Sequence, residues 1–333
     1  MKRFTRKIAS GLVIIIAMTL ILPLTAGAVK VGDSEISSTG AVVLDFETNV
    51  VLFGHNEAVR RVPASMVKMV AVYVVYDAIQ DGWVTMDSRL VISAGVSEFS
   101  RNTTYSNVPL EEGQLYSVRE LLEAVIVRSA SAATVALGEG IFGSERAFVQ
   151  RMNAKAASMN IWSDFRDSWG GSRDSRVSPL ALAWIMRALI MDYPEVLEIT
   201  SLSSITFRDF RNGEPLPASN HLLSTYPGAD GLKTGFTIPA GHCLIGTAER
   251  DGRRLITVTM GNTVTTRYPD TITLLDFGFA NADKIIAEHQ ANVTVTPPPP
   301  PPLPPANVPV MPSNKNLMEI VFWVLSLTGV LQS

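Results

Sequence analysis

The chain has 333 residues, of which 47% are hydrophobic and 18% are charged, and its formal net charge is −3. A chain of this size can bury a substantial core in one or two domains. The slight negative charge and the lack of a basic cluster in the body argue against a nucleic-acid partner. The four histidines show no metal-ligand spacing, and we expect neither a metal ion nor another cofactor.

The first residues are typical of an export signal. Lys2, Arg3, Arg6 and Lys7 precede an apolar run over residues 8–24, and small residues follow at positions 26–28. We therefore expect a signal peptide over residues 1–28 and an exported body. An uncleaved amino-terminal anchor is the alternative, because the apolar run approaches the roughly 17 residues of a short membrane span.

The first motif of chemical interest is Ser65-Met66-Val67-Lys68, after two expected strands at residues 41–44 and 50–53. It opens an apolar run that predicts a buried helix over residues 65–80. Residues three apart on a helix share a face, so the serine hydroxyl and the lysine amine emerge together. A lone Ser-x-x-Lys match is weak, but a lysine in a buried helix requires a reason. A nucleophile beside its base is one such reason.

The middle of the chain is predicted to be helical. The second motif, Ser129-Ala130-Ser131, falls between the first two of these helices, and the capping-box pair Ser117 and Glu120 opens the first. The expected helices are residues 118–127, 131–139, 145–158 and 179–191.

The chain then returns to strands. The third motif, Lys233-Thr234-Gly235, precedes expected strands at residues 243–248 and 255–260, which a turn around Asp251 and Gly252 joins. Strands at both ends of the body with helices between them predict an α/β (α+β) fold, in which the end strands pair in one antiparallel sheet.

The final segment predicts a spacer and a membrane anchor. Residues 286–316 are expected to form a linker that is rich in proline. The apolar residues 317–333 are expected to form an anchor that either spans the membrane or lies in its surface. The expected domain between the signal peptide and the linker is residues 29–285. These features together place the body outside the cytoplasm, anchored to the outer face of the cell membrane.

On the three motifs, and on the longer segments 40–56, 117–153 and 226–261, the chain resembles the penicillin-binding D-alanyl-D-alanine carboxypeptidases. The resemblance covers about residues 35–280 and implies a β-lactamase-like fold. In that fold an antiparallel sheet is flanked by helices, and the active site lies between the sheet and an all-helical subdomain. The implied activity is removal of the terminal D-alanine from peptidoglycan stem pentapeptides, with β-lactams as covalent inhibitors.

The resemblance also implies roles for single residues. Ser65 is the expected nucleophile, Lys68 the general base, and Ser129 the proton relay to the leaving amine. The backbone N–H groups of Ser65 and Phe236 are expected to form the oxyanion hole. The residues expected to bind substrate are Ser131, Lys233, Thr234, Gly235 and Phe236.

Two segments depart from the family pattern. Ser131 stands where the family has an asparagine, and a lost buried hydrogen bond there costs about 1–3 kcal/mol. The loop 164–174 lacks the usual family residues. These departures leave open a catalytically weak or inactive homologue that binds penicillin or peptidoglycan. A serine β-lactamase is a further alternative, but no Glu-x-x-Leu-Asn segment lies between the second and third motifs.

Overall fold

The computed structural model describes residues 28–208 and 210–293. Most of the expected signal peptide, the linker from residue 294 onward and the whole expected anchor lie outside these residues. The chain divides into two compact units, one that ends at His289 and one that begins at Gln290. In the described part of the chain, no helix combines the length and the apolar character that crossing a membrane requires.

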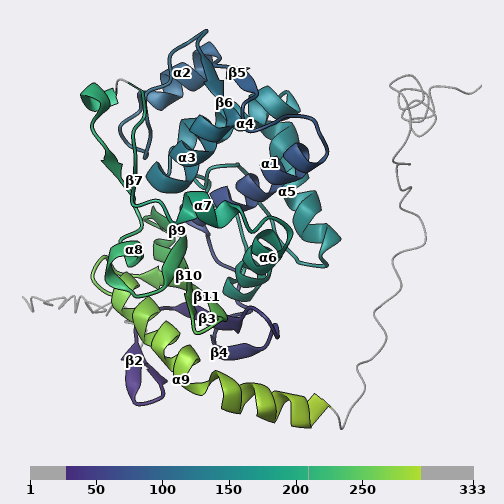
Figure 1. The fold of residues 1–333 in the computed structure, drawn as a ribbon, viewed down its shortest axis with the longest axis vertical. Helices are drawn as coiled ribbons and strands as arrows, with labels where there is room; N and C mark the ends of the chain where they lie inside the picture. Colours follow the sequence, from purple (N-terminus) through teal and green to yellow (C-terminus); the bar gives the residue numbers. More distant parts are fainter. Residues whose placement is uncertain (1–27, 209, 294–333) are drawn as a thin grey trace, which may run out of the picture. The chain divides into compact units, whose positions relative to one another are not determined.

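A five-stranded antiparallel sheet lies at the centre of the first unit, with the strand order β4-β3-β11-β10-β9 (Figure 1). Its pairing confirms that strands from both ends of the body meet, because Leu44 of β3 lies opposite Ile256 of β11. Asp251 and Gly252 turn β10 into β11 with φ values of 50° and 76°, as a tight hairpin turn requires. The strands are β3 (Gly40–Asp45), β4 (Val51–His55), β9 (Ala229–Thr237), β10 (Gly241–Arg250) and β11 (Arg253–Asn262).

Helices pack on one face of this sheet and extend from it as a helical region around α1 (Figure 1). The α1 helix is apolar on nearly all sides, and ten of its residues are buried, which explains its central position. Ser117 and Glu120 form the predicted capping box at the start of α3. The helices are α1 (Lys68–Gln80), α2 (Ala94–Ser100), α3 (Val118–Arg128), α4 (Ser131–Phe142), α5 (Glu145–Ser158), α6 (Pro179–Asp192) and α7 (Val196–Thr200).

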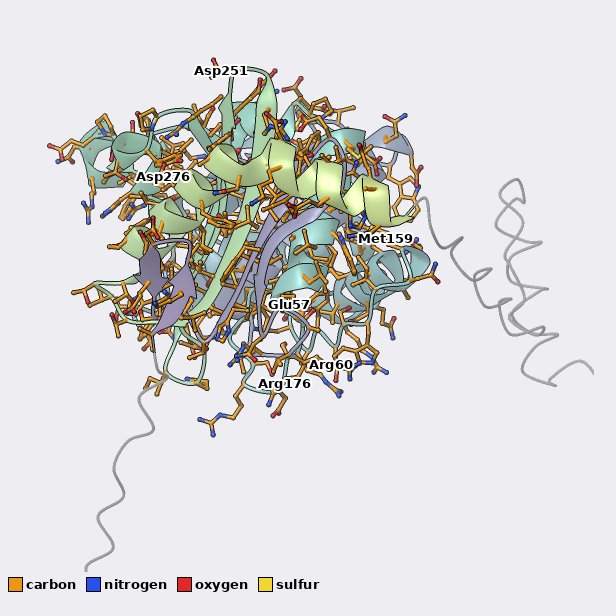
Figure 2. The ribbon with its side chains drawn as sticks, turned by 90° about the horizontal axis from the view of Figure 1, so that it is seen from below. Glu57, Arg60, Met159, Arg176, Asp251 and Asp276 are labelled. Carbon is orange, nitrogen blue, oxygen red and sulfur yellow. The ribbon has the colours of Figure 1, made fainter. Side chains whose placement is uncertain are left out.

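The long helix α9 (Arg267–Val293) lies across the opposite face of the sheet (Figure 2). Its Leu274 and Leu275 are fully buried in a second apolar cluster with alternate residues of β3 and β10. Gly278 lets the helix approach closely, since a Cβ there would lie 2.7 Å from Leu255 Cδ1. The α9 helix ends at Val293, within the segment that we expected to be linker.

Short elements complete the unit. Apart from the 3₁₀ helix over residues 64–67, which overlaps the predicted helix over residues 65–80, the sequence did not predict them, nor did it predict α2, α7, α9 and β9. They are the strand pairs β1 (Val29–Val31) with β2 (Ser34–Ile36), β5 (Arg89–Val91) with β6 (Leu115–Ser117) and β7 (Ser204–Ile205) with β8 (Leu216–Pro217), the helix α8 (Leu222–Thr225), and the 3₁₀ helices η1 (Ala64–Val67) and η2 (Phe210–Gly213).

The predicted helix over residues 65–80 differs from the structure at its start. Its first turn is the 3₁₀ helix η1, and α1 begins only at Lys68. Pro63 precedes this turn, and Ala64 has a φ of 50°, in the left-handed region that most residues avoid. The tight turn therefore separates Ser65 from the regular helix that carries Lys68.

Candidate active site

The residues that the sequence singled out meet in one cleft of about 300 Å³. Ser65, Ser129, Ser131, Thr234, Gly235 and Phe236 line this cleft. Lys68 and Lys233 are fully buried, and the amine of each contacts a lining residue, Ser65 for Lys68 and Thr234 for Lys233. Three separate parts of the fold supply them: the junction of η1 with α1, the corner between α3 and α4, and strand β9.

Three oxygen atoms lie within hydrogen-bond distance of Lys68 Nζ. Its Nζ lies 2.9 Å from Ser65 Oγ and 3.2 Å from Ser131 Oγ. The third acceptor is the backbone carbonyl oxygen of Trp169, at 2.7 Å. The amine is therefore fixed against the hydroxyl of Ser65.

The surroundings of Lys68 also lower its pKa well below the ordinary lysine value. Burial is the main cause, and the nearby ammonium of Lys233 acts in the same direction. The carboxylate of Asp167 opposes both effects and raises the pKa. The lowered pKa eases loss of a proton from the Lys68 ammonium, and the amine that results can accept a proton from the Ser65 hydroxyl.

Ser129 lies at the end of α3 in a left-handed conformation, with φ of 60° and ψ of 29°. This conformation ends α3 sharply and lets α4 begin at Ser131 after a single intervening residue. The side chain of Asn107 holds the corner, because its Oδ1 accepts from the N–H of Ala132 at 2.8 Å. Within the described residues the Ser129 hydroxyl has no hydrogen-bond partner, so it is available to a bound molecule.

Strand β9 forms the opposite wall and is the edge strand of the sheet. It packs directly on η1: a Cβ added to Gly235 would lie 3.2 Å from the Ala64 Cβ. The glycine therefore permits the close approach of this strand to the nucleophile turn. An edge strand also has free backbone groups that an extended peptide can pair with.

Lys233 is fully buried beside the cleft residue Thr234, and its Nζ donates to the Thr234 carbonyl oxygen at 3.2 Å. Burial lowers the pKa of Lys233 to about 7, and the positive charge of Arg267 contributes. The Thr234 hydroxyl lies 3.3 Å from Ser219 Oγ at the cleft surface. The next residue, Phe236, is exposed and stacks on His242 with ring centroids 4.3 Å apart.

The unusual loop 164–174 is built around the carboxylate of Asp167. Its Oδ1 accepts from the N–H groups of Trp169 at 3.2 Å and Gly170 at 2.5 Å. Its Oδ2 accepts from the N–H of Ser172. This clasp turns the Trp169 carbonyl toward Lys68, so the loop contributes a main-chain atom to the site despite its departure from the family pattern.

The sequence analysis missed two functional candidates, Arg267 and His242, which also line the cleft. Arg267 donates to the Tyr268 hydroxyl at 3.1 Å, but its buried Nε has no partner among the described residues. The buried Nδ1 of His242 also lacks one. Arg267 is the first residue of α9, and no local spacing links it to the three motifs. Only a prediction of the helix over residues 267–293, which the sequence did not give, would have pointed to Arg267.

The described residues contain no group of three or more histidine, cysteine, aspartate or glutamate side chains that is arranged to hold a metal ion. The polar side chains at this cleft include serine and threonine hydroxyls, the imidazole of His242 and the guanidinium of Arg267. The single cysteine, Cys243, is buried on β10, and burial raises the pKa of its thiol to about 11.

Comparison with known proteins agrees with this geometry. The chain is 30% identical to the D-alanyl-D-alanine carboxypeptidase DacF of Bacillus subtilis over 247 residues, which cover 72% of this chain and 61% of the relative. It is 34% identical to DacD of Escherichia coli, over 68% of this chain and 59% of that protein. The chain thus spans about three fifths of the length of these curated relatives.

A solved structure shares the fold. The ampicillin-bound form of penicillin-binding protein D2 from Listeria monocytogenes has a TM-score of 0.63 and 30% identity, and the match covers 73% of this chain and 98% of that one. Residues 27–264 match the family described as D-alanyl-D-alanine carboxypeptidase, which comprises extracytoplasmic cell-wall enzymes. By sequence, fold and the arrangement of this cleft, the chain belongs to the D-alanyl-D-alanine carboxypeptidase family.

Proposed function

We propose that the chain is a serine-type carboxypeptidase that removes the terminal D-alanine from peptidoglycan stem pentapeptides. The observation that carries the proposal is the fully buried Lys68, whose Nζ lies 2.9 Å from the Ser65 hydroxyl oxygen. A buried amine with a lowered pKa can remove the proton that makes serine a poor nucleophile. Family membership supports the same activity.

In the first half of the reaction, Ser65 Oγ attacks the carbonyl carbon between the two D-alanines while its proton passes to Lys68. The backbone N–H groups of Ser65 and Phe236 stabilise the resulting oxyanion, at about 3–4 kcal/mol per donor in comparable sites. The bond to the leaving nitrogen then breaks as the Ser129 hydroxyl gives its proton to that nitrogen and takes in its place the proton that Lys68 had accepted. D-Alanine leaves, and an acyl-enzyme on Ser65 remains.

In the second half, a water molecule attacks the acyl-enzyme and Lys68 accepts a proton from it. The Ser65–acyl bond breaks as Lys68 returns this proton to Ser65 Oγ, and the shortened peptide is released. Throughout, the positive charges of Lys233 and Arg267 and the Thr234 hydroxyl hold the terminal carboxylate of the substrate. Gly235 and the free edge of β9 accommodate its extended backbone.

The same groups support covalent binding of β-lactams, which carry a carboxylate beside a reactive amide. The related structure in its ampicillin-bound form agrees with this part of the proposal. A Glu-x-x-Leu-Asn segment would support fast release of the bound drug. The sequence between the second and third motifs contains none, so a β-lactamase activity is disfavoured.

A weak or inactive homologue is the second candidate, and Ser131 is the observation that favours it. Its hydroxyl lies 3.2 Å from Lys68 Nζ, the longest of the three bonds to that amine. A serine also lacks the amide donors that an asparagine offers to substrate. The peptide would then bind without rapid cleavage.

One pair of measurements separates these candidates. The purified chain and its Ser65→Ala variant are incubated with a fluorescent penicillin and, separately, with a stem pentapeptide. A stable adduct on Ser65 together with D-alanine release supports the carboxypeptidase. An adduct without D-alanine release favours the weak or inactive homologue. Rapid hydrolysis of penicillin favours a β-lactamase activity. Absence of any adduct contradicts all the enzymatic readings.

We further propose that the enzyme acts outside the cytoplasm, tethered to the membrane. Support comes from the export signal pattern of residues 1–28, the proline-rich residues 286–316 and the apolar residues 317–333. Fractionation of cells that produce the full chain, with and without residues 317–333, tests the tether. Removal of that segment should release the protein from the membrane fraction.

A further inference from the structure

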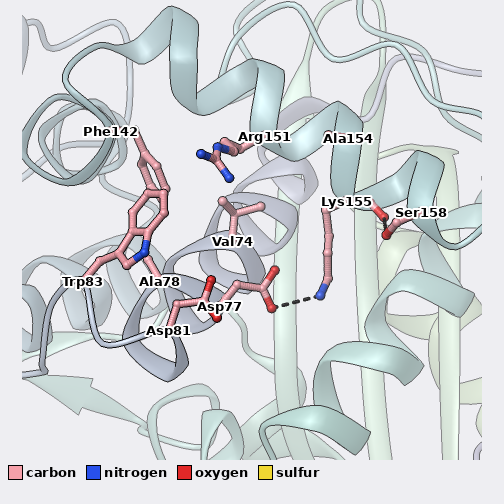
Figure 3. Close-up of a pocket in the computed structure, with 10 residues that line it drawn as sticks. All are labelled: Val74, Asp77, Ala78, Asp81, Trp83, Phe142, Arg151, Ala154, Lys155 and Ser158. Atoms are coloured by element: carbon pink, nitrogen blue, oxygen red, sulfur yellow. Dashed lines mark hydrogen bonds and ion pairs between the residues drawn. The ribbon is translucent and has the colours of Figure 1, made fainter. Parts of the chain in front are cut away.

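A second hollow, of about 290 Å³, lies where the C-terminal end of α1 meets α5 (Figure 3). Lys68 is at the opposite end of α1, and none of the residues proposed to act in the cleft lines this hollow. The side chains that matter here are Asp77, Asp81, Trp83, Phe142, Arg151 and Lys155. The hollow is thus separate from the proposed active site.

Aromatic side chains close one end of the hollow. Trp83 is 50% exposed, and its ring centroid lies 6.0 Å from that of Phe142. The guanidinium carbon of Arg151 lies 4.9 Å from the centroid of the Trp83 ring. A half-open indole beside a hollow offers apolar contact to a bound molecule.

Two of the charges in the hollow are already paired. Lys155 Nζ lies 2.9 Å from Asp77 Oδ1 and 3.8 Å from the centroid of the Tyr73 ring. The hydroxyl of Tyr193 donates to the same Asp77 oxygen at 2.8 Å. These contacts fix Asp77 and leave its Oδ2 without a hydrogen-bond partner among the described residues.

The other two charges are unpaired. Arg151 and Asp81 form no ion pair within the described residues, although they have opposite signs and line the same hollow. In Figure 3 the guanidinium of Arg151 lies on one side of the hollow, and the carboxylates of Asp77 and Asp81 lie on the other. The charges of Asp77, Asp81, Arg151 and Lys155 sum to zero. A ligand with a net charge would therefore leave the hollow with an uncompensated charge.

We propose that this hollow binds a small zwitterion of the α-amino acid class. The guanidinium of Arg151 donates to the ligand carboxylate, while Asp81 and the free Oδ2 of Asp77 accept from its ammonium group. Trp83 and Phe142 pack against its side chain. A neutral sugar would leave Arg151 and Asp81 without counter-charges, and a simple anion would engage only one of them. The proposal stands independently of the proposed carboxypeptidase function.

Isothermal titration calorimetry on the purified full chain tests the proposal, with L-leucine and D-leucine as the probes. We expect saturable binding at one site per chain. N-Acetyl-leucine lacks the ammonium and isoamylamine lacks the carboxylate, and each should bind at least about tenfold more weakly because a charge-assisted hydrogen bond is lost. This comparison changes only the ligand and leaves the protein intact.

Variants locate the binding. Arg151→Gln and Asp81→Asn should each weaken leucine binding by about tenfold or more. Both residues are exposed, and thermal melting confirms that the variants fold. The matched control is Arg146→Gln, which changes an exposed arginine of α5 outside the hollow and should bind leucine normally.

Four outcomes would overturn the proposal: no saturable leucine binding up to its solubility, equal binding of N-acetyl-leucine, equal binding by the Arg151→Gln variant, or preferential binding of chitotriose. Equal binding by the Arg151→Gln variant would place leucine elsewhere, such as in the cleft. Preference for chitotriose would identify a carbohydrate site instead.

Discussion

Two of the walls of the cleft contribute to Lys68 in different ways. The wall formed by η1 and β9 supplies side chains, since Ser65 contacts the lysine directly and the buried ammonium of Lys233 lowers its pKa. The wall formed by loop 164–174 supplies a main-chain carbonyl, that of Trp169. A side-chain contribution requires a particular residue, whereas many sequences can present a backbone oxygen. The loop can therefore differ from the family pattern and still complete the site.

The largest expected effect comes from the wall that acts through side chains. Lys68→Met fills the buried space but removes the proposed base, so kcat/KM for D-alanine release should fall by about 10²- to 10⁴-fold. Acylation by a fluorescent penicillin should slow in parallel. Lys284→Met, an exposed change on α9, is the control. A Lys68→Met variant with the wild-type rate would show that Lys68 is not the general base.

Ser131→Asn sharpens the comparison at the corner between α3 and α4. The amide oxygen reaches farther than the serine hydroxyl, and the amide adds donors for the substrate. One recovered buried hydrogen bond is worth about 1 kcal/mol or more, so turnover should rise by about tenfold. Unchanged turnover in a variant of unchanged melting temperature would show that Ser131 does not restrict the rate.

The pH dependence of KM tests Lys233. With its pKa lowered to about 7, Lys233 carries its charge below that pH and loses it above. Carboxylate binding by the free enzyme should therefore weaken, and KM should rise several fold, as the pH increases through about 7. A peptide that ends in D-alanine amide is the control, because it has no carboxylate to lose this partner. The same rise with both peptides would assign the effect to another group.

The smallest effect is expected from the wall that acts through its backbone. Asp167→Asn keeps an oxygen that can accept from the loop N–H groups but removes the negative charge that raises the pKa of Lys68. The pKa of Lys68 should fall, and the acid limb of the kcat/KM profile should move to lower pH, with a gain of a few fold on that limb. Asp174→Asn, in the same loop, should leave the profile unchanged. Identical profiles for the two variants would contradict the role of Asp167.

The sequence predicted the parts of this molecule whose pattern is local. The helix over residues 145–158 has the predicted bounds, and the antiparallel pairing of the end strands is confirmed. The start of α9 was missed because Thr271, Ile272 and Thr273 have weak helix propensity and Gly278 reads as a break. That glycine serves packing against the sheet, which only the tertiary structure reveals.

The site shows the same division. The motif residues could be found from their spacing together with the family resemblance, but the Trp169 carbonyl could not, since a backbone atom leaves no signature in the sequence. Arg267 and His242 were missed because they reach the cleft only through the packing of α9 and the pairing of β10 with β9. The positions of the Trp169 carbonyl, Arg267 and His242 all depend on contacts between segments that are distant in the chain.

Gly170 gives the loop a sharply uneven tolerance to mutation. Its φ is 88°, and a Cβ at this position would collide with the Ala64 carbonyl oxygen and lie 2.8 Å from the Ser65 nitrogen. In a saturation library scored for penicillin labelling, neighbours such as Arg173 should accept most residues, while position 170 should accept glycine alone. Position 170 thus restricts sequence change in the loop at the point where the loop touches the backbone of the nucleophile.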